Sequence, residues 1–145
     1  MKLLITGIPG TGKTTIGEYL ETNYGFLHLN VEKDPAKLKD FIEIPRDKKV
    51  ITWGFIPGFD DDTVKIIQSL GYKMIWFDGN RPAARRAFCR RKTVSVEALD
   101  IQMKKVENMD ISVFNPIIMD TFDKNGNFLE QDIIVSKLMS ILSQS

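Results

Sequence analysis

The feature that most constrains this chain is the string Gly7-Ile8-Pro9-Gly10-Thr11-Gly12-Lys13-Thr14. It follows the apolar run Leu3-Leu4-Ile5, which predicts a buried strand. It precedes Ile16, Tyr19 and Leu20, whose spacing predicts one face of a helix. A G-x-x-x-x-G-K-[ST] string between a strand and a helix is typical of a phosphate-binding P-loop. The string therefore predicts binding of a nucleoside triphosphate rather than a simple glycine-rich turn.

Each residue type in the loop has an expected task. Glycine lets the backbone curl so that successive N–H groups point at phosphate oxygens, and the following helix adds the positive end of its dipole. We expect Lys13 to reach the β- and γ-phosphates and the Thr14 hydroxyl to hold Mg²⁺. Thr15, the next residue, is included in the expected nucleotide-binding set, which is Gly7, Ile8, Pro9, Gly10, Thr11, Gly12, Lys13, Thr14 and Thr15.

Composition narrows the class of protein. The 145 residues are enough for one domain with one core, so we expect a single domain over 1–145. A net charge of +1 gives no field that would attract nucleic acid or an anionic membrane. The single cysteine, Cys89, excludes a disulfide framework. With no apolar run near the length of a membrane span and no room for a signal peptide before the first strand, the sequence predicts a cytoplasmic protein.

Strand and helix patterns alternate along the chain, which predicts an α/β fold: a three-layer P-loop arrangement with a five-stranded parallel sheet and helices on both faces. Because ligands in such sheets lie beyond the carboxyl ends of the strands, we expect Gly7, Asn30, Gly54, Asp78 and Asp120 to converge on one cleft. The expected strands are Leu3–Ile5, Phe26–Leu29, Val50–Trp53, Met74–Phe77 and Ile117–Met119. The expected helices are Lys13–Tyr24, Pro35–Ile42, one with Val64, Ile67 and Leu70 inward, one opened by Asn80 and Pro82, Ser95–Met109, and a last one with Ile134, Leu138, Ile141 and Leu142 inward.

Two large P-loop classes do not fit. AAA-type ATPases carry a helical lid domain and a paired acidic motif after the third strand, whereas this chain has Thr52-Trp53-Gly54 there. Ras-type GTPases need Asn-Lys-x-Asp to read guanine, and that string does not occur. Of the P-loop classes considered, the small kinases remain.

The segment Arg86-Ala87-Phe88-Cys89-Arg90-Arg91 resembles the Arg-x-x-x-Arg-Arg end of the lid helix in adenylate kinase-like and shikimate kinase-like enzymes. The resemblance implies that Arg86 lies on the adenine, that Arg90 reaches the transferring phosphates, and that a short lid follows near 92–95. A guanidinium can stack on a base or fork onto phosphate oxygens, and residues four apart share a helix flank. Three alternatives stay open: a solvated helix face, a weak nucleic-acid patch, or a register in which Arg91 replaces Arg90.

The acceptor motifs of those kinases are not met. The chain has Asn30-x-Glu32 where shikimate kinases have Asp-x-Asp, and Arg46 is the sole arginine between the second and third strands. A nucleoside monophosphate would be poorly held there. The tracts Thr52–Phe55 and Trp76–Gly79 also resemble a bacterial group of P-loop proteins without a settled substrate.

Several further residues are candidates with two interpretations each. Asp34, with Glu32 beside it, is the expected catalytic base, although Asp34-Pro35 also suits a helix opening. Asp78 could hold a Mg²⁺ water or form a turn. Trp53 and Phe55 could line an acceptor site or belong to the core, and His28 is expected to be packed. The turn around Asn125-Gly126 could contact adenine or be a turn only.

Two functions follow. The first is an ATP-dependent kinase that transfers the γ-phosphate to a small hydroxyl- or phosphate-bearing acceptor, with Lys13, Arg90 and Asp34 as catalytic residues. The second is an NTPase or switch that acts on a protein partner. A polynucleotide kinase would need a basic groove, which the composition does not support. The sequence leaves the oligomeric state open.

Overall fold

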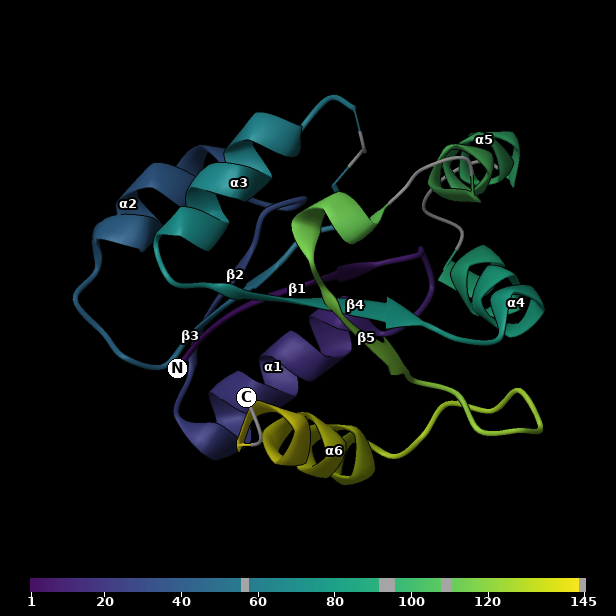
Figure 1. The fold of residues 1–145 in the computed structure, drawn as a ribbon. Coiled ribbons are helices and arrows are strands. Elements are labelled where there is room, and N and C mark those ends of the chain that lie inside the picture. Colours follow the sequence, from purple (N-terminus) through teal and green to yellow (C-terminus); the bar gives the residue numbers. More distant parts are fainter. Residues whose placement is uncertain (56–57, 92–95, 108–110, 144–145) are drawn as a thin grey trace.

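The computed structural model describes residues 1–55, 58–91, 96–107 and 111–143. Its centre is a five-stranded, all-parallel sheet in the order β2-β3-β1-β4-β5, with helices on both faces (Figure 1). The predicted α/β class and parallel sheet are confirmed. The elements in chain order are β1 (Lys2–Gly7), α1 (Lys13–Tyr24), β2 (Leu27–Asn30), η1 (Pro35–Lys37), α2 (Leu38–Glu43), β3 (Lys49–Thr52), α3 (Asp61–Ser69), β4 (Lys73–Asp78), α4 (Arg81–Arg91), α5 (Val96–Glu107), η2 (Ile111–Phe114), β5 (Ile117–Asp120) and α6 (Gln131–Ser143).

Two helices, α1 and α6, cover one face of the sheet (Figure 1). Their apolar residues pack on the side chains that β1, β3, β4 and β5 direct to that face. Because strands of a parallel sheet are covered on both sides, β1 is apolar at consecutive positions, as its sequence predicts. The buried residues of this layer are Leu3, Ile5, Ile16, Leu20, Phe26, Val50, Ile75, Phe77, Met119, Ile134, Val135, Leu138 and Leu142.

The opposite face carries α2, α3 and α4 (Figure 1). Aromatic side chains cluster near the carboxyl ends of β3 and β4. The ring of Phe55 packs at 5.6 Å from Phe114, 5.8 Å from Trp53 and 6.4 Å from Trp76. Phe55 is 3% exposed, so of the two interpretations of this residue the core one holds.

The segment between β2 and β3 is fixed to the sheet by a buried lysine. Lys49 Nζ donates to the carbonyl oxygens of Phe41, Ile42 and Ile44 at 2.8–2.9 Å. These carbonyls end α2, so the ammonium caps that short helix at its negative end. The sequence suggested one helix over Pro35–Ile42; the structure instead has a 3₁₀ turn followed by α2.

Helix α1 has the predicted bounds and ends at Gly25, whose φ of 72° is left-handed. One expected core position is wrong: Leu70 is 42% exposed because α3 ends at Ser69, whereas Val64 and Ile67 are buried. The expected lid near 92–95 lies outside the described residues. Within the described part of the chain, no helix is long and apolar enough to cross a membrane.

Candidate nucleotide-binding site

The P-loop links β1 to α1 at the carboxyl edge of the sheet. Gly7 has φ 135°, and a Cβ there would clash with the backbone of Phe77, because Ile8 N donates to Phe77 O at 3.1 Å. Only glycine allows β1 and β4 to approach this closely before the loop turns.

The start of α1 is open to an anion. Gly12 occupies the N-cap in a left-handed conformation, no side chain caps the helix, and its first turn holds no acidic residue. Helix N–H groups without intrahelical partners and the positive end of the dipole therefore lie at the loop. Lys13 Nζ donates to Ile8 O at 3.1 Å and to Gly7 O at 3.4 Å, so the ammonium lies over the loop.

A threonine that follows β5 is hydrogen-bonded to the P-loop at the same edge of the sheet. Thr121 is fully buried, and its hydroxyl donates to Thr11 O at 3.0 Å, while the Thr11 hydroxyl donates to Ile8 O at 2.8 Å. The two threonines are 110 positions apart, so sequence reasoning did not connect them.

The two predicted lid arginines lie together on one side of a small pocket. Arg86 and Arg90 of α4 line a cavity of about 170 Å³ opposite the turn Asn125–Phe128. A Cβ on Gly126 would lie 3.5 Å from Arg86 Nη2, which shows how closely α4 approaches that turn. The arginine pair and the turn after β5 are therefore brought together, as the resemblance implied. The side chain of Arg91 lies outside what the structure describes.

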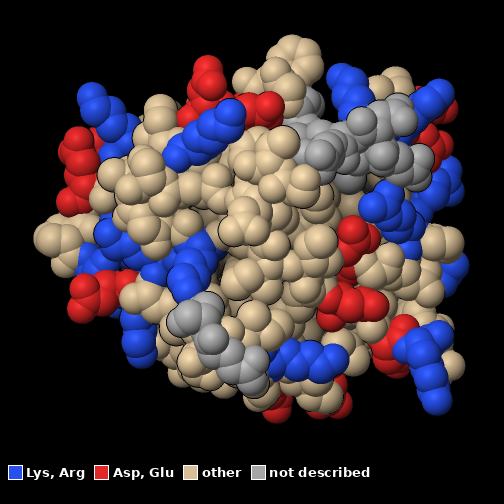
Figure 2. All heavy atoms as spheres, viewed as in Figure 1, with Lys and Arg blue, Asp and Glu red and all other residues tan. Residues whose placement is uncertain are grey.

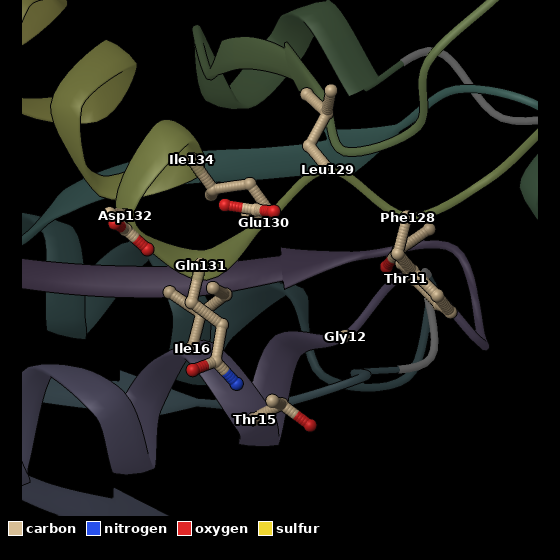
Figure 3. A pocket seen from close by; sticks show the side chains of 10 residues that line it. All are labelled: Thr11, Gly12, Thr15, Ile16, Phe128, Leu129, Glu130, Gln131, Asp132 and Ile134. Carbon is tan, nitrogen blue, oxygen red and sulfur yellow. The ribbon is translucent and has the colours of Figure 1, made fainter.

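Phe128 is the site residue that sequence reasoning missed. Its ring stacks on Phe122 with centroids 4.5 Å apart, and a Cβ on Gly12 would lie 3.6 Å from its Cε1. It lines the arginine pocket and also a second cavity of about 490 Å³ beside the P-loop (Figure 3). In Figure 3, Phe128 and Thr11 lie at one end of that cavity and Asp132 at the other. Its sequence signal is an aromatic residue three positions before the last helix, beside the Asn125-Gly126 turn.

The second cavity runs from the P-loop to the start of α6. Its polar lining includes Thr15 on α1 together with Glu130, Gln131 and Asp132, and Ile16 and Ile134 form its apolar wall. The hydroxyl, amide and carboxylate groups that line this cavity can hydrogen-bond to the hydroxyls of a sugar.

Helix α4 is tied to α5 by a two-point ion pair. Arg85 donates from Nε and Nη2 to the two carboxylate oxygens of Asp100 at 3.0 and 3.3 Å. The hydrogen bond to Arg85 holds the pKa of Asp100 below its usual value. Both side chains are about half exposed, so the pair orients the two helices more than it stabilises them.

Oxygen atoms suited to a hard cation gather beside Lys13. Asn30 Nδ2 donates to Thr14 Oγ1 at 3.3 Å, and Gly54 N donates to Glu32 Oε1 at 2.7 Å. A Cβ on Gly54 would contact Glu32 Oε1 and lie 3.6 Å from Lys13 Cε, so the Glu32 carboxylate and the lysine stem both lie against Gly54. Within the described residues no cluster of three or more His, Cys, Asp or Glu side chains forms a metal cage. The Thr14 hydroxyl fits Mg²⁺, which takes most of its ligands from phosphate and water.

The other candidates have local partners. Asp34 precedes η1, is 42% exposed, and lies 4.0 Å from Lys37. Asp78 accepts from Gly79 N at 2.8 Å and from Trp76 Nε1 at 3.2 Å, and it pairs with Arg81 at 3.4 Å.

His28 is packed, as expected. Its Nε2 lies 2.7 Å from Thr52 Oγ1, and burial lowers the pKa of the imidazole.

Charged side chains do not form a basic surface in the view of Figure 2. Lysine and arginine are interspersed with acidic residues around the rim, and the centre of this face is mostly uncharged. This arrangement agrees with the net charge of +1.

No protein-family model matches the chain. The chain is 24% identical over 139 residues to a Thermococcus gammatolerans protein described as "Putative adenylate kinase", covering 91% of this chain and 76% of the relative. A 30-residue segment is 57% identical to adenylate kinase of Malacoplasma penetrans, covering 21% of this chain and 14% of that protein.

Solved structures match over almost the whole chain. Shikimate kinase from Bacteroides thetaiotaomicron superposes with a TM-score of 0.70 at 15% identity, covering 99% of this chain and 98% of that one. A gluconokinase from Sinorhizobium meliloti gives 0.67 at 12% identity, covering 99% and 91%. The predicted resemblance is confirmed: the chain has the fold of the small P-loop kinases and is similar in sequence to proteins described as adenylate kinases.

Proposed function

We propose that the chain is an ATP-dependent kinase that phosphorylates a small, weakly charged molecule. The observation that carries the proposal is the pocket in which Arg86 and Arg90 face the turn after β5, beside a P-loop whose helix start is open to an anion. A phosphate cradle alone would serve any NTPase. Phosphoryl transfer also needs positive charge beside the transferring group, and an arginine in the adjoining nucleoside pocket can supply it.

The triphosphate would lie along Gly7–Thr15, with Lys13 on the β- and γ-phosphates. The base would enter between Arg86 and the ring of Phe128, which both line the arginine pocket. Backbone groups of that turn, rather than a base-specific side chain, would contact its edge, so adenine is expected to be favoured only modestly over guanine.

Charge on the transferring phosphoryl group would be balanced by Lys13, Arg90 and a Mg²⁺ held by Thr14. When bound, the metal ion neutralises the phosphate oxygens and orients them for in-line attack. Arg90 can fork across two oxygens, which a lysine cannot do. The chain's own task is thus positioning and charge stabilisation.

Between β2 and β3, a stretch that the structure describes in full, the sole arginine is held away from the P-loop. Arg46 donates to Gly25 O at 2.9 Å. Gly25 caps the far end of the 12-residue α1, about 18 Å from the P-loop at 1.5 Å per residue. The one arginine of this segment is therefore turned away from the phosphates, which disfavours a nucleoside monophosphate and supports a hydroxyl-bearing acceptor.

A carboxylate would take the proton of the acceptor hydroxyl. Asp34 was expected in this role, and Glu32 beside it is better supported because its carboxylate and the Lys13 stem both lie against Gly54. The printed names of the structural matches, a gluconokinase and a shikimate kinase, suggest polyhydroxylated acceptors as the first compounds to try. The expected cytoplasmic location gives access to ATP.

The experiment is a metabolite screen that reads ADP release with Mg²⁺ and ATP. Sugars, sugar acids, other polyols and nucleoside monophosphates are supplied one at a time to wild type and to Lys13→Ala. We expect one polyol class to stimulate ADP release by the wild type only. Stimulation by a protein fraction and by no small molecule would instead support the alternative, a nucleotide-dependent switch.

A further inference from the structure

We propose that Asn30 is a positioning residue that sets the magnesium-holding hydroxyl of Thr14 and the loop carrying Glu32 relative to each other. The inference rests on the proposed binding of Mg²⁺ and ATP. Asn30 is the last residue of β2, and its side chain contacts both the P-loop helix and the following loop.

The hydrogen bonds of the amide fix which way it faces. Its oxygen accepts from Glu32 N at 3.1 Å and from Lys33 N at 3.4 Å. A flipped amide would direct its own N–H groups at those two donors, so the NH₂ must face Thr14. Thr14 Oγ1 consequently accepts from Asn30, at 3.3 Å.

The same residue organises the loop that holds both candidate carboxylates. Asp34 N donates to the backbone oxygen of Asn30 at 3.0 Å, and Val31 N donates to Thr52 O at 3.1 Å. The loop is therefore tied to the end of β3 at Val31 and to the end of β2 at Glu32 and Asp34. One side chain thereby couples the nucleotide side of the site to the acceptor side.

A neutral amide at this position has an electrostatic consequence. It occupies one lone pair of the Thr14 oxygen and brings no negative charge to the metal. A carboxylate would accept the same two backbone N–H groups through one oxygen and accept the Thr14 hydroxyl proton through the other. Both lone pairs of Thr14 would then be available to the cation, and the added charge would attract it.

The test compares Asn30→Asp and Asn30→Ala by calorimetric ATP binding over a Mg²⁺ titration and in EDTA. Asn30→Asp should lower the Mg²⁺ concentration for half-maximal enhancement of ATP affinity, on the order of fivefold. Asn30→Ala should raise it about tenfold, as loss of an outer partner of a metal ligand does. Affinity for ATP in EDTA should stay the same in Asn30→Ala, because the phosphate cradle is intact, and should fall in Asn30→Asp, because the added carboxylate repels the metal-free triphosphate.

Asn23→Asp and Asn23→Ala are the matched controls, since Asn23 lies on the exposed face of α1 and its amide donates only locally to Tyr19 O at 3.2 Å. Neither Asn23 variant should change the Mg²⁺ dependence of ATP binding or the affinity for ATP in EDTA. A parallel loss of affinity with and without Mg²⁺ in both Asn30 variants would show a merely structural role and overturn the inference. An unchanged Mg²⁺ dependence in Asn30→Asp would overturn it as well. A wild type that binds no ATP would refute the proposed function itself, which keeps the two failures apart.

Discussion

The carboxylate of Glu32 accepts a 2.7 Å hydrogen bond from the backbone N–H of Gly54. The bond joins the loop after β2 to the loop after β3. The end of β3, Thr52-Trp53-Gly54, has no acidic residue, so Glu32 brings a carboxylate to that position. One carboxylate oxygen is held by the backbone, which leaves the other able to face an acceptor hydroxyl.

Glu32→Gln should lower kcat about a hundredfold or more while ATP affinity is unchanged. Glutamine keeps an oxygen for Gly54 N but cannot take a proton, and general-base catalysis contributes on this order. The measurement is steady-state kinetics with the acceptor found in the screen, together with calorimetric ATP binding. If Asp34→Asn shows the loss and Glu32→Gln does not, Asp34 is the base.

The two pocket arginines should separate kinetically. Arg86→Ala should raise KM for ATP with little change in kcat, because stacking on the base is equal in the ground and transition states. Arg90→Ala should lower kcat by about a thousandfold, because charge develops on the transferring oxygens only as the bond breaks. Arg90→Lys should recover little.

Arg46→Ala is the control for these arginines, since its guanidinium bonds to Gly25 O at the far end of α1. It should be kinetically silent. Were Arg91→Ala to show the kcat loss in place of Arg90→Ala, the register of the arginine pair would be wrong by one residue.

Phe128→Ala should weaken ATP binding about tenfold, the order of magnitude expected for one lost base–aromatic contact. Phe128→Tyr should bind as wild type does. Phe59, which is 79% exposed, supplies a matched truncation away from the cavity walls that the structure describes. Equal dissociation constants for Phe128→Ala and Phe59→Ala would remove Phe128 from the nucleotide site.

Stability should fall as pH drops below about 6.5. Burial lowers the pKa of His28, and it is the chain's one histidine. Between that lowered pKa and the unfolded value the unfolded chain binds more protons, so the free energy of unfolding decreases as pH falls through the window. Urea unfolding at pH 7.5 and 5.5 measures the change. His28→Gln should reduce it, and an identical pH dependence in the variant would show that other groups are responsible.

Sequence reasoning reached the fold because its signals are local and strong. The P-loop letters lie between a strand and a helix, and Gly25 marks the end of α1 by a conformation that glycine favours. The arginine pair was found by its spacing and its resemblance to lid helices. The pocket wall that faces this pair was predicted only in part. The turn at Asn125-Gly126 was a candidate, but the position of the Phe128 ring near Gly12 depends on tertiary packing.

The missed relationships are tertiary contacts that the local sequence does not signal. Thr121 and Thr11, Arg46 and Gly25, and Lys49 and the end of α2 each join segments whose separation no periodic pattern encodes. The exposure of Leu70 has a different cause, because the helical period predicted an inward position one residue beyond the observed end of α3.

Transfer of label from ATP tests the central claim most directly. ATP labelled in its γ-phosphate is incubated with Mg²⁺, the stimulating compound from the screen, and either wild type or Lys13→Ala. The account predicts that the wild type moves the label onto the small molecule in proportion to the ADP formed and that Lys13→Ala moves none. Label recovered only as inorganic phosphate, at a rate that no small molecule changes, would contradict the kinase assignment.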